Sequence, residues 1–136
     1  PAAGITEETP ATEVNGTILV VEDDEAVRRT TATMLDALGF SVLVAPGWRE
    51  ALALAEREDT SLELLLTDVV MPELSGRELC ERLRTVRPRL RVLYMSGYTA
   101  NIIAHHGIPE DGVHFIQKPF TMDDLARAIR TALVGL

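Results

Sequence analysis

Side chains that can bind a cation or a phosphoryl group stand directly after, or at the end of, short apolar runs of this sequence. The positions are Glu22 and Asp23 after TILVV, Asp68 in LELLLTD, Ser96 in LRVLYMS and Lys118 in VHFIQK. Neighbouring carboxylates repel each other by about 4 kcal/mol per close pair at an effective dielectric of about 20, unless a cation lies between them. Oxygen-only ligands favour a hard ion such as Mg²⁺, and a nearby ammonium and hydroxyl neutralise phosphoryl oxygens. The pattern predicts a phosphoryl-group site in which Asp68 is the available nucleophile and forms an acyl phosphate.

A fold that collects these residues must bring the ends of several strands together. Apolar runs predict strands over residues 17–21, 41–45, 62–68, 90–96 and 113–118, and helical patterns follow them. Near-continuous apolar strands that alternate with helices are typical of a parallel sheet covered on both faces. We therefore predict an α/β fold, a single doubly wound (βα)5 domain with a five-stranded parallel sheet in the flavodoxin-like order 2-1-3-4-5. Ligands of such sheets bind at the carboxyl ends of the strands.

Local patterns place several boundaries. Ser75 with Glu78, and Thr121 with Asp124, predict capping boxes at two helix starts. Helices are also expected over residues 48–58 and, more weakly, 99–106. Residues 1–15 have no apolar period and are interpreted as a flexible linker or tail, which leaves 16–136 as the domain. Because the first residue is Pro rather than Met, we expect a segment of a longer protein.

Composition excludes several classes of protein. The 136 residues are 46% hydrophobic and 25% charged, an ordinary balance for a globular domain. The formal net charge of −8 disfavours binding to nucleic acid or to an anionic membrane surface. Cys80 is the single cysteine, so we expect neither disulfides nor a zinc cluster. A single free cysteine favours a reducing, cytoplasmic location. No apolar run is long enough to span a membrane.

Four segments, ILVVEDDEAVR, LLLTDVVMPELSGREL, VLYMSGYT and FIQKPF, together resemble the receiver domain of two-component response regulators. The resemblance extends over essentially all of residues 17–136. It implies that Asp68 is the phosphoacceptor, that Asp23 binds Mg²⁺ directly, and that Glu22 acts largely through a metal-bound water. The main-chain carbonyl of Val70 completes the protein ligands, and Mn²⁺ is an expected substitute for Mg²⁺.

The resemblance also implies roles outside the carboxylates. Ser96 and Lys118 are expected to hold the phosphoryl oxygens, and the Lys118–Pro119 bond is expected to be cis. Ser96 moves toward the phosphoryl group, and Phe115 rotates into the vacated space as the switch aromatic. Phe115 lacks the hydroxyl of the more usual Tyr, so the hydrogen bond that a Tyr would make in the inward state is not expected here. Val70 and Tyr98 occupy the positions that tune dephosphorylation.

The context of the domain has two interpretations. MSGYT followed by FIQKPF looks most like receivers at the C-terminus of hybrid sensor histidine kinases, and a standalone regulator is nearly as consistent. The expected partner is a histidine kinase dimerisation domain or a histidine phosphotransfer domain, docked over the first helix and the loops at the strand ends. The last strand and helix, residues 113–133, are where phosphorylation is expected to be read out. A dimer that forms on phosphorylation is a further expectation.

Other functions compete with this interpretation. A phosphatase of the haloacid-dehalogenase type needs an Asp-x-Asp pair after its first strand, whereas Val70 stands two residues after Asp68. A degenerate receiver that only binds partners would not need the intact set of acids, hydroxyl and ammonium. A flavodoxin would need a phosphate-binding loop where this chain carries acids.

Trp48 is interpreted as a residue that covers the edge of the second helix.

Overall fold

The computed structural model describes residues 17–57, 61–71, 73–97 and 114–134. The elements in chain order are β2 (Thr17–Val21), α2 (Glu25–Ala37), β3 (Ser41–Ala45), α3 (Trp48–Ala55), β4 (Leu62–Asp68), α4 (Gly76–Leu83), β5 (Arg91–Ser96), β6 (His114–Gln117) and α6 (Met122–Val134). Among them, no helix is long and apolar enough to cross a bilayer.

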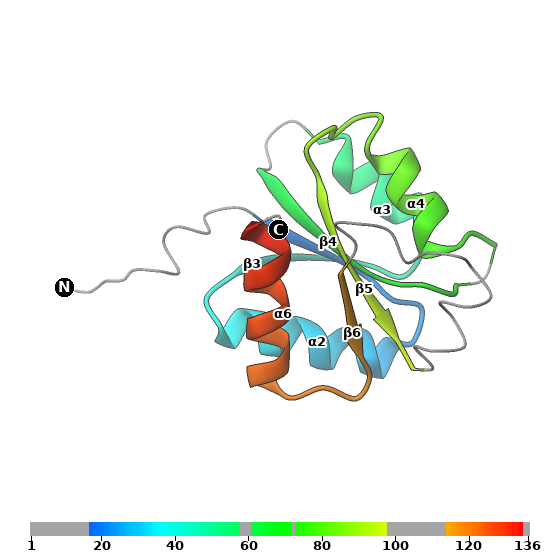
Figure 1. Cartoon of the computed structure of the whole chain (residues 1–136). Helices are drawn as coiled ribbons and strands as arrows, with labels where there is room; N and C mark the ends of the chain where they lie inside the picture. Colours follow the sequence, from blue (N-terminus) through cyan, green and yellow to red (C-terminus); the bar gives the residue numbers. More distant parts are fainter. Residues whose placement is uncertain (1–16, 58–60, 72, 98–113, 135–136) are drawn as a thin grey trace.

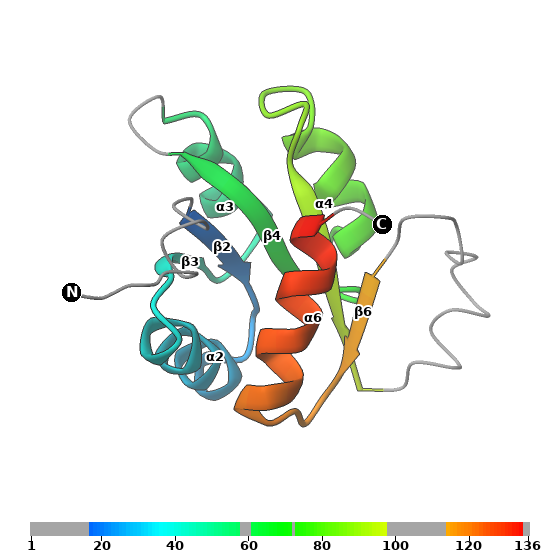
Figure 2. The same ribbon diagram turned by 60° about the vertical axis from the view of Figure 1, so that its left-hand side comes forward.

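All strand pairs are parallel, and the sheet order is β3-β2-β4-β5-β6. By position along the chain this is 2-1-3-4-5, so the predicted topology is confirmed. Helices α2 and α6 cover one face of the sheet and α3 and α4 the other (Figures 1 and 2). Register aligns Val21 with Thr67, and Asp68 with Met95. The polar residues that end the strands therefore gather at one edge.

The sheet separates two apolar clusters, which explains why the strand sequences are apolar almost throughout. Leu19 and Val21 of β2 pack toward α3 and α4, and Ile18 and Val20 pack toward α2 and α6. This division follows from the alternation of side chains along a strand. Every one of these four side chains is fully buried. The buried sheet fixes the strand ends that carry the polar residues.

Capping residues fix the starts of three helices. Asp24 caps α2 by accepting the Val27 N–H at 3.1 Å. At α4, the capping box predicted from Ser75 and Glu78 is present, with both hydrogen bonds at 3.1 Å. The reciprocal pair of Thr121 and Asp124 closes the first turn of α6 in the same manner.

The predicted boundaries are accurate to a few residues. The predicted helix over 48–58 ends as α3 at Ala55, and the predicted strands over 90–96 and 113–118 are shorter as β5 and β6. Helix ends and strand ends depend on local capping and pairing, which periodicity does not resolve. The helix expected over 99–106 and the linker expected over 1–15 lie outside the described residues.

Candidate functional site

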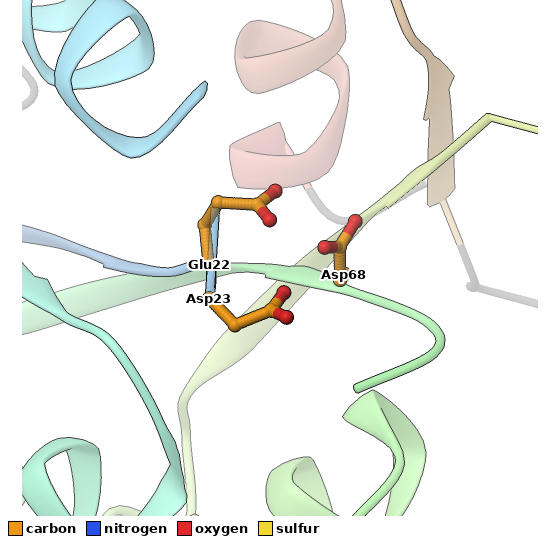
Figure 3. A group of neighbouring side chains, drawn as sticks. All are labelled: Glu22, Asp23 and Asp68. Atoms are coloured by element: carbon orange, nitrogen blue, oxygen red, sulfur yellow. The ribbon is translucent and has the colours of Figure 1, made fainter. Parts of the chain in front are cut away.

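Three carboxylates from two strands meet at the carboxyl edge of the sheet. Glu22 and Asp23 follow β2, and Asp68 is the last residue of β4, the strand beside it. One oxygen from each lies within 4.8 Å of the others. Figure 3 shows the three carboxylates facing a common space. Glu22 and Asp68 are buried, whereas Asp23 is exposed, so the group opens to solvent on the side of Asp23.

The ammonium of Lys118 is the cation that partly balances these acids. Its Nζ lies 2.9 Å from Asp68 Oδ1 and 3.2 Å from Glu22 Oε1. Burial lowers the pKa of Lys118, but the hydrogen bond to Asp68 and the charges of Asp68 and Glu22 together raise it above its ordinary value. Lys118 therefore stays charged.

The position of Lys118 is set by the backbone around it. Its N–H donates to the Ser96 carbonyl at 2.8 Å, which continues the pairing of β5 with β6 by one residue. The Lys118–Pro119 peptide bond is cis, as the resemblance implied. The backbone directly after β6 thus places the Lys118 side chain beside the acidic group.

Glu22 is the acid whose ionisation the site affects most. Burial raises its pKa to about 7, helped by the hydrogen bond and the charge of Asp68, while the Asp24 N–H and Lys118 act in the opposite direction. The Asp24 N–H donates to Glu22 Oε2 at 3.0 Å. Arg28 of α2 donates through Nη1 to the Glu22 carbonyl oxygen at 2.9 Å. Sequence reasoning missed Arg28, although an arginine in the second turn of the helix after two acids is a signal for such a contact.

A glycine holds the start of α4 against the backbone of Asp68. A Cβ added to Gly76 would lie 2.0 Å from the Asp68 carbonyl oxygen, so only glycine fits at this approach. The Gly76 N–H donates to the Val69 carbonyl at 2.8 Å. This hydrogen bond ties the first residue of α4 to the residue that follows Asp68. Sequence reasoning placed Gly76 in a capping box and did not foresee this contact.

The other residues singled out from the sequence are placed as follows. Ser96 is buried at the end of β5, one strand away from Asp68. Phe115 is half-buried on β6, with its ring centroid 5.4 Å from that of Tyr94 on the neighbouring strand. Val70 is 52% exposed just beyond Asp68. Tyr98 lies outside the described residues.

The acidic group fits a small, hard cation. Opposite oxygens of an octahedral Mg²⁺ shell are about 4 Å apart, since each bond is about 2.1 Å. One oxygen from each of the three carboxylates lies within 4.8 Å of the others, near enough for the three to share one cation. Three carboxylates and one ammonium carry a formal charge of −2 when all are ionised, which matches a divalent cation. The donor set contains oxygen alone, as Mg²⁺ and Mn²⁺ prefer.

Sequence comparison identifies the family of domains to which a chain with this sheet order, and with acids and a lysine at its carboxyl edge, belongs. The profile of the response regulator receiver domain family matches residues 18–130. The chain therefore belongs to the receiver domain family of two-component signalling. Receiver domains generally bind Mg²⁺, and this chain has the acidic cluster of Glu22, Asp23 and Asp68.

Particular relatives come from different kinds of protein. The chain is 34% identical over 126 residues to the sensor kinase CckA of Brucella abortus, covering 90% of this chain and 13% of that kinase. It is 32% identical to the response regulator receiver protein CpdR of the same organism, covering 87% of this chain and 97% of CpdR. Against the transcriptional regulator NtrC of Azospirillum brasilense, the identity is 32% and the chain covers 86% of its own length but 24% of NtrC.

Two solved structures are similar to this chain. The crystal structure of the receiver domain from the hybrid histidine kinase CckA superposes with a TM-score of 0.72 at 36% identity, covering 87% of this chain and 99% of that one. The chemotaxis protein CheY4 of Vibrio cholerae superposes with a TM-score of 0.76 at 24% identity, covering 88% of this chain and 99% of that one. The second match shows the fold alone.

Proposed function

We propose that the domain accepts a phosphoryl group from a phosphohistidine onto Asp68. In this step the N–P bond of the donor breaks, its nitrogen keeps the electron pair, and a bond forms between phosphorus and a carboxylate oxygen of Asp68. The observation that carries the proposal is the 2.9 Å contact of Lys118 Nζ with Asp68 Oδ1 at the edge of the sheet. An ammonium in contact with the nucleophile is placed to neutralise the oxygens of the incoming group.

Glu22, Asp23 and Asp68, with the main-chain carbonyl of Val70, are the residues that would hold Mg²⁺ or, in its place, Mn²⁺. When bound, Mg²⁺ neutralises charge on the phosphoryl oxygens. The common space between the three carboxylates supports this assignment (Figure 3).

Ser96 and Phe115 form the proposed switch. The Ser96 hydroxyl and the Lys118 ammonium would both donate hydrogen bonds to the phosphoryl oxygens. The Phe115 ring would rotate into the space that Ser96 leaves. Two observations support it. Ser96 is buried at the end of the strand next to β4, and Phe115 is half-buried on the next strand, β6. The Phe115 ring contacts the ring of Tyr94, with the two centroids 5.4 Å apart. Val70 and Tyr98 are the proposed positions that tune the loss of the phosphoryl group.

The parent is proposed to be a hybrid sensor histidine kinase, in which residues 1–15 form a linker and 16–136 the receiver. A standalone regulator is the alternative, since relatives of both kinds match. The partner would be a histidine kinase dimerisation domain or a histidine phosphotransfer domain in the cytoplasm, with no role for nucleic acid. A cavity of about 450 Å³ next to Lys118, lined by apolar and small residues of α2 and by Phe120, supports docking over α2. Dimerisation on phosphorylation is a further outcome to measure.

The test is the intact mass of the chain after incubation with acetyl phosphate, with Mg²⁺ and with EDTA. The wild type should gain one phosphoryl group only with Mg²⁺, and Asp68→Asn should gain none. Asp36→Asn is the matched control, because it removes an exposed carboxylate of α2 and should be phosphorylated like the wild type. An adduct that persists in Asp68→Asn would contradict the proposal. If the wild type forms no adduct, binding of beryllofluoride with Mg²⁺ separates a short-lived adduct from a domain that only binds partners.

A further inference from the structure

A second polar contact lies beside the acidic group, between α3 and the loop that follows β4. The indole Nε1 of Trp48, the first residue of α3, donates to Glu73 Oε1 at 3.1 Å. Both residues line a cavity of about 290 Å³ whose wall also includes Asp23 and Met71. The pair, here called the Trp48–Glu73 clasp, therefore borders the same space as one of the three carboxylates.

Two arginines hold the ring of Trp48 in place. The guanidinium carbon of Arg49 lies 4.8 Å from the ring centroid, and that of Arg82 lies 5.1 Å from it. Both distances are within the range of cation–π attraction. Arg82 belongs to α4, so the ring is fixed from the helix beyond the loop as well as from its own helix. The indole N–H consequently has a defined direction.

The loop that the clasp contacts has an unusual backbone. Glu73 has φ 74°, in the left-handed region, which residues other than glycine rarely adopt. Such a conformation persists where surrounding contacts hold it. The hydrogen bond from Gly76 N–H to the Val69 carbonyl joins the first residue of α4 to the residue that follows β4. The clasp supplies the contact at Glu73, and Val70 lies between these two fixed points.

We propose that the Trp48–Glu73 clasp is a positioning device that keeps the described residues of this loop, 69–71 and 73–75, in the conformation needed for cation binding. This inference rests on the proposed function, in which Val70 offers its carbonyl to the cation. Neither Trp48 nor Glu73 is a ligand. The clasp lies on the side of the site where Asp23 is exposed, and Asp23 and Met71 line the same cavity as the clasp.

The experiment is a calorimetric titration of the metal-free chain with Mg²⁺. Trp48→Phe keeps an aromatic ring for the two arginines and removes the N–H donor. Glu73→Ala removes the acceptor. Each should raise the Kd for Mg²⁺ by about two- to tenfold, the change expected when one hydrogen bond of ordinary net strength is lost. Because both variants break the same contact, the double variant should be no weaker than either single variant.

Two matched variants separate the clasp from simple charge. Glu50→Ala removes another exposed carboxylate that lines the same cavity, and it should leave the Kd for Mg²⁺ nearly unchanged. Glu73→Gln keeps an oxygen acceptor and should keep most of the affinity. Thermal unfolding of each variant shows that the titrations are done on folded protein. Glu73 is exposed, so its variants should fold as the wild type does.

Several results would overturn the inference. An unchanged Kd in Trp48→Phe would do so, as would equal weakening by Glu73→Ala and Glu50→Ala, or by Glu73→Ala and Glu73→Gln. Additive losses in the double variant would also overturn it. A wild type that binds no Mg²⁺ would remove the proposed metal site and the clasp with it. Normal binding in the wild type with unaffected variants would remove the clasp alone.

Discussion

Lys118 Nζ and Asp68 Oδ1 are 2.9 Å apart, although β4, which ends at Asp68, and β6, which precedes Lys118, are separated in the sheet by β5. The same ammonium lies 3.2 Å from Glu22 Oε1. In the absence of a cation, the lysine is thus the counterion of two buried acids. The same ammonium repels an incoming divalent cation and attracts an incoming phosphoryl group, and these two effects can be measured separately.

Replacing Lys118 should therefore change metal binding and phosphorylation in opposite directions. In Lys118→Met, removal of the positive charge should tighten Mg²⁺ binding about fivefold, which corresponds to about 1 kcal/mol of relieved repulsion. Phosphorylation by acetyl phosphate should slow about a hundredfold, as for loss of one preorganised charge donor. Calorimetry gives the first quantity and time-resolved intact mass the second. Arg130→Met, on the exposed side of α6, is the control for loss of a positive charge, and weaker Mg²⁺ binding in Lys118→Met would refute the prediction.

The raised pKa of Glu22 predicts a pH dependence of the metal-free fold. Below pH about 4.5 the group is protonated in both the folded and the unfolded chain. Between that value and about 7, the unfolded chain ionises Glu22 while the folded chain retains the proton, so the free energy of unfolding should fall as pH rises. Above about 7 the loss is complete. Urea unfolding in EDTA at several pH values measures it.

Glu22→Gln is the variant that isolates this effect, because the amide keeps the size of the side chain and does not ionise. Its free energy of unfolding should change less than that of the wild type between pH 5 and pH 7.5, a range that covers most of the interval in which Glu22 titrates. Identical pH profiles for Glu22→Gln and the wild type would show that another group is responsible.

Gly76→Ala should damage the fold and the site together. The added Cβ would meet the Asp68 carbonyl oxygen at 2.0 Å, so either α4 or the end of β4 must shift. Overpacking of this kind destabilises by about 2 kcal/mol. Gly97→Ala is the matched control, since a Cβ there meets nothing within 4 Å. Chemical unfolding of both variants tests the difference, and equal stabilities would contradict the close approach.

Phe115→Ala should uncouple phosphorylation from its structural response. Asp68 and Lys118 remain in place, so beryllofluoride with Mg²⁺ should still bind. The amide NMR shifts that the wild type shows in α6 on binding should shrink, because the proposed rotating ring is gone. Phe120→Ala is the control, as Phe120 packs in the cluster on the α2 and α6 face. A full shift response in Phe115→Ala would exclude the aromatic from the switch.

The sequence predicts well those features that repeat along the chain. Apolar runs and capping residues locate the strands and helix starts, and parallel pairing then brings Glu22, Asp23 and Asp68 to one edge. What periodicity does not contain is how loops close in space. The Trp48–Glu73 clasp depends on a left-handed residue that is not glycine, and the Gly76 contact depends on the distance between a helix and a strand. Both features depend on contacts between separate segments of the fold, and the sequence alone indicates for Trp48 only that it covers a helix edge.

Trp48 is the only tryptophan in the sequence. Its indole touches a carboxylate and lies near two guanidinium groups at the loop beside the acidic group. Ultraviolet excitation of this chain at the red edge of absorption therefore selects one chromophore, and its emission reports the electrostatic surroundings of that loop without an attached dye. The domain carries its own optical probe, at a position separate from the residues that would bind the cation or the phosphoryl group.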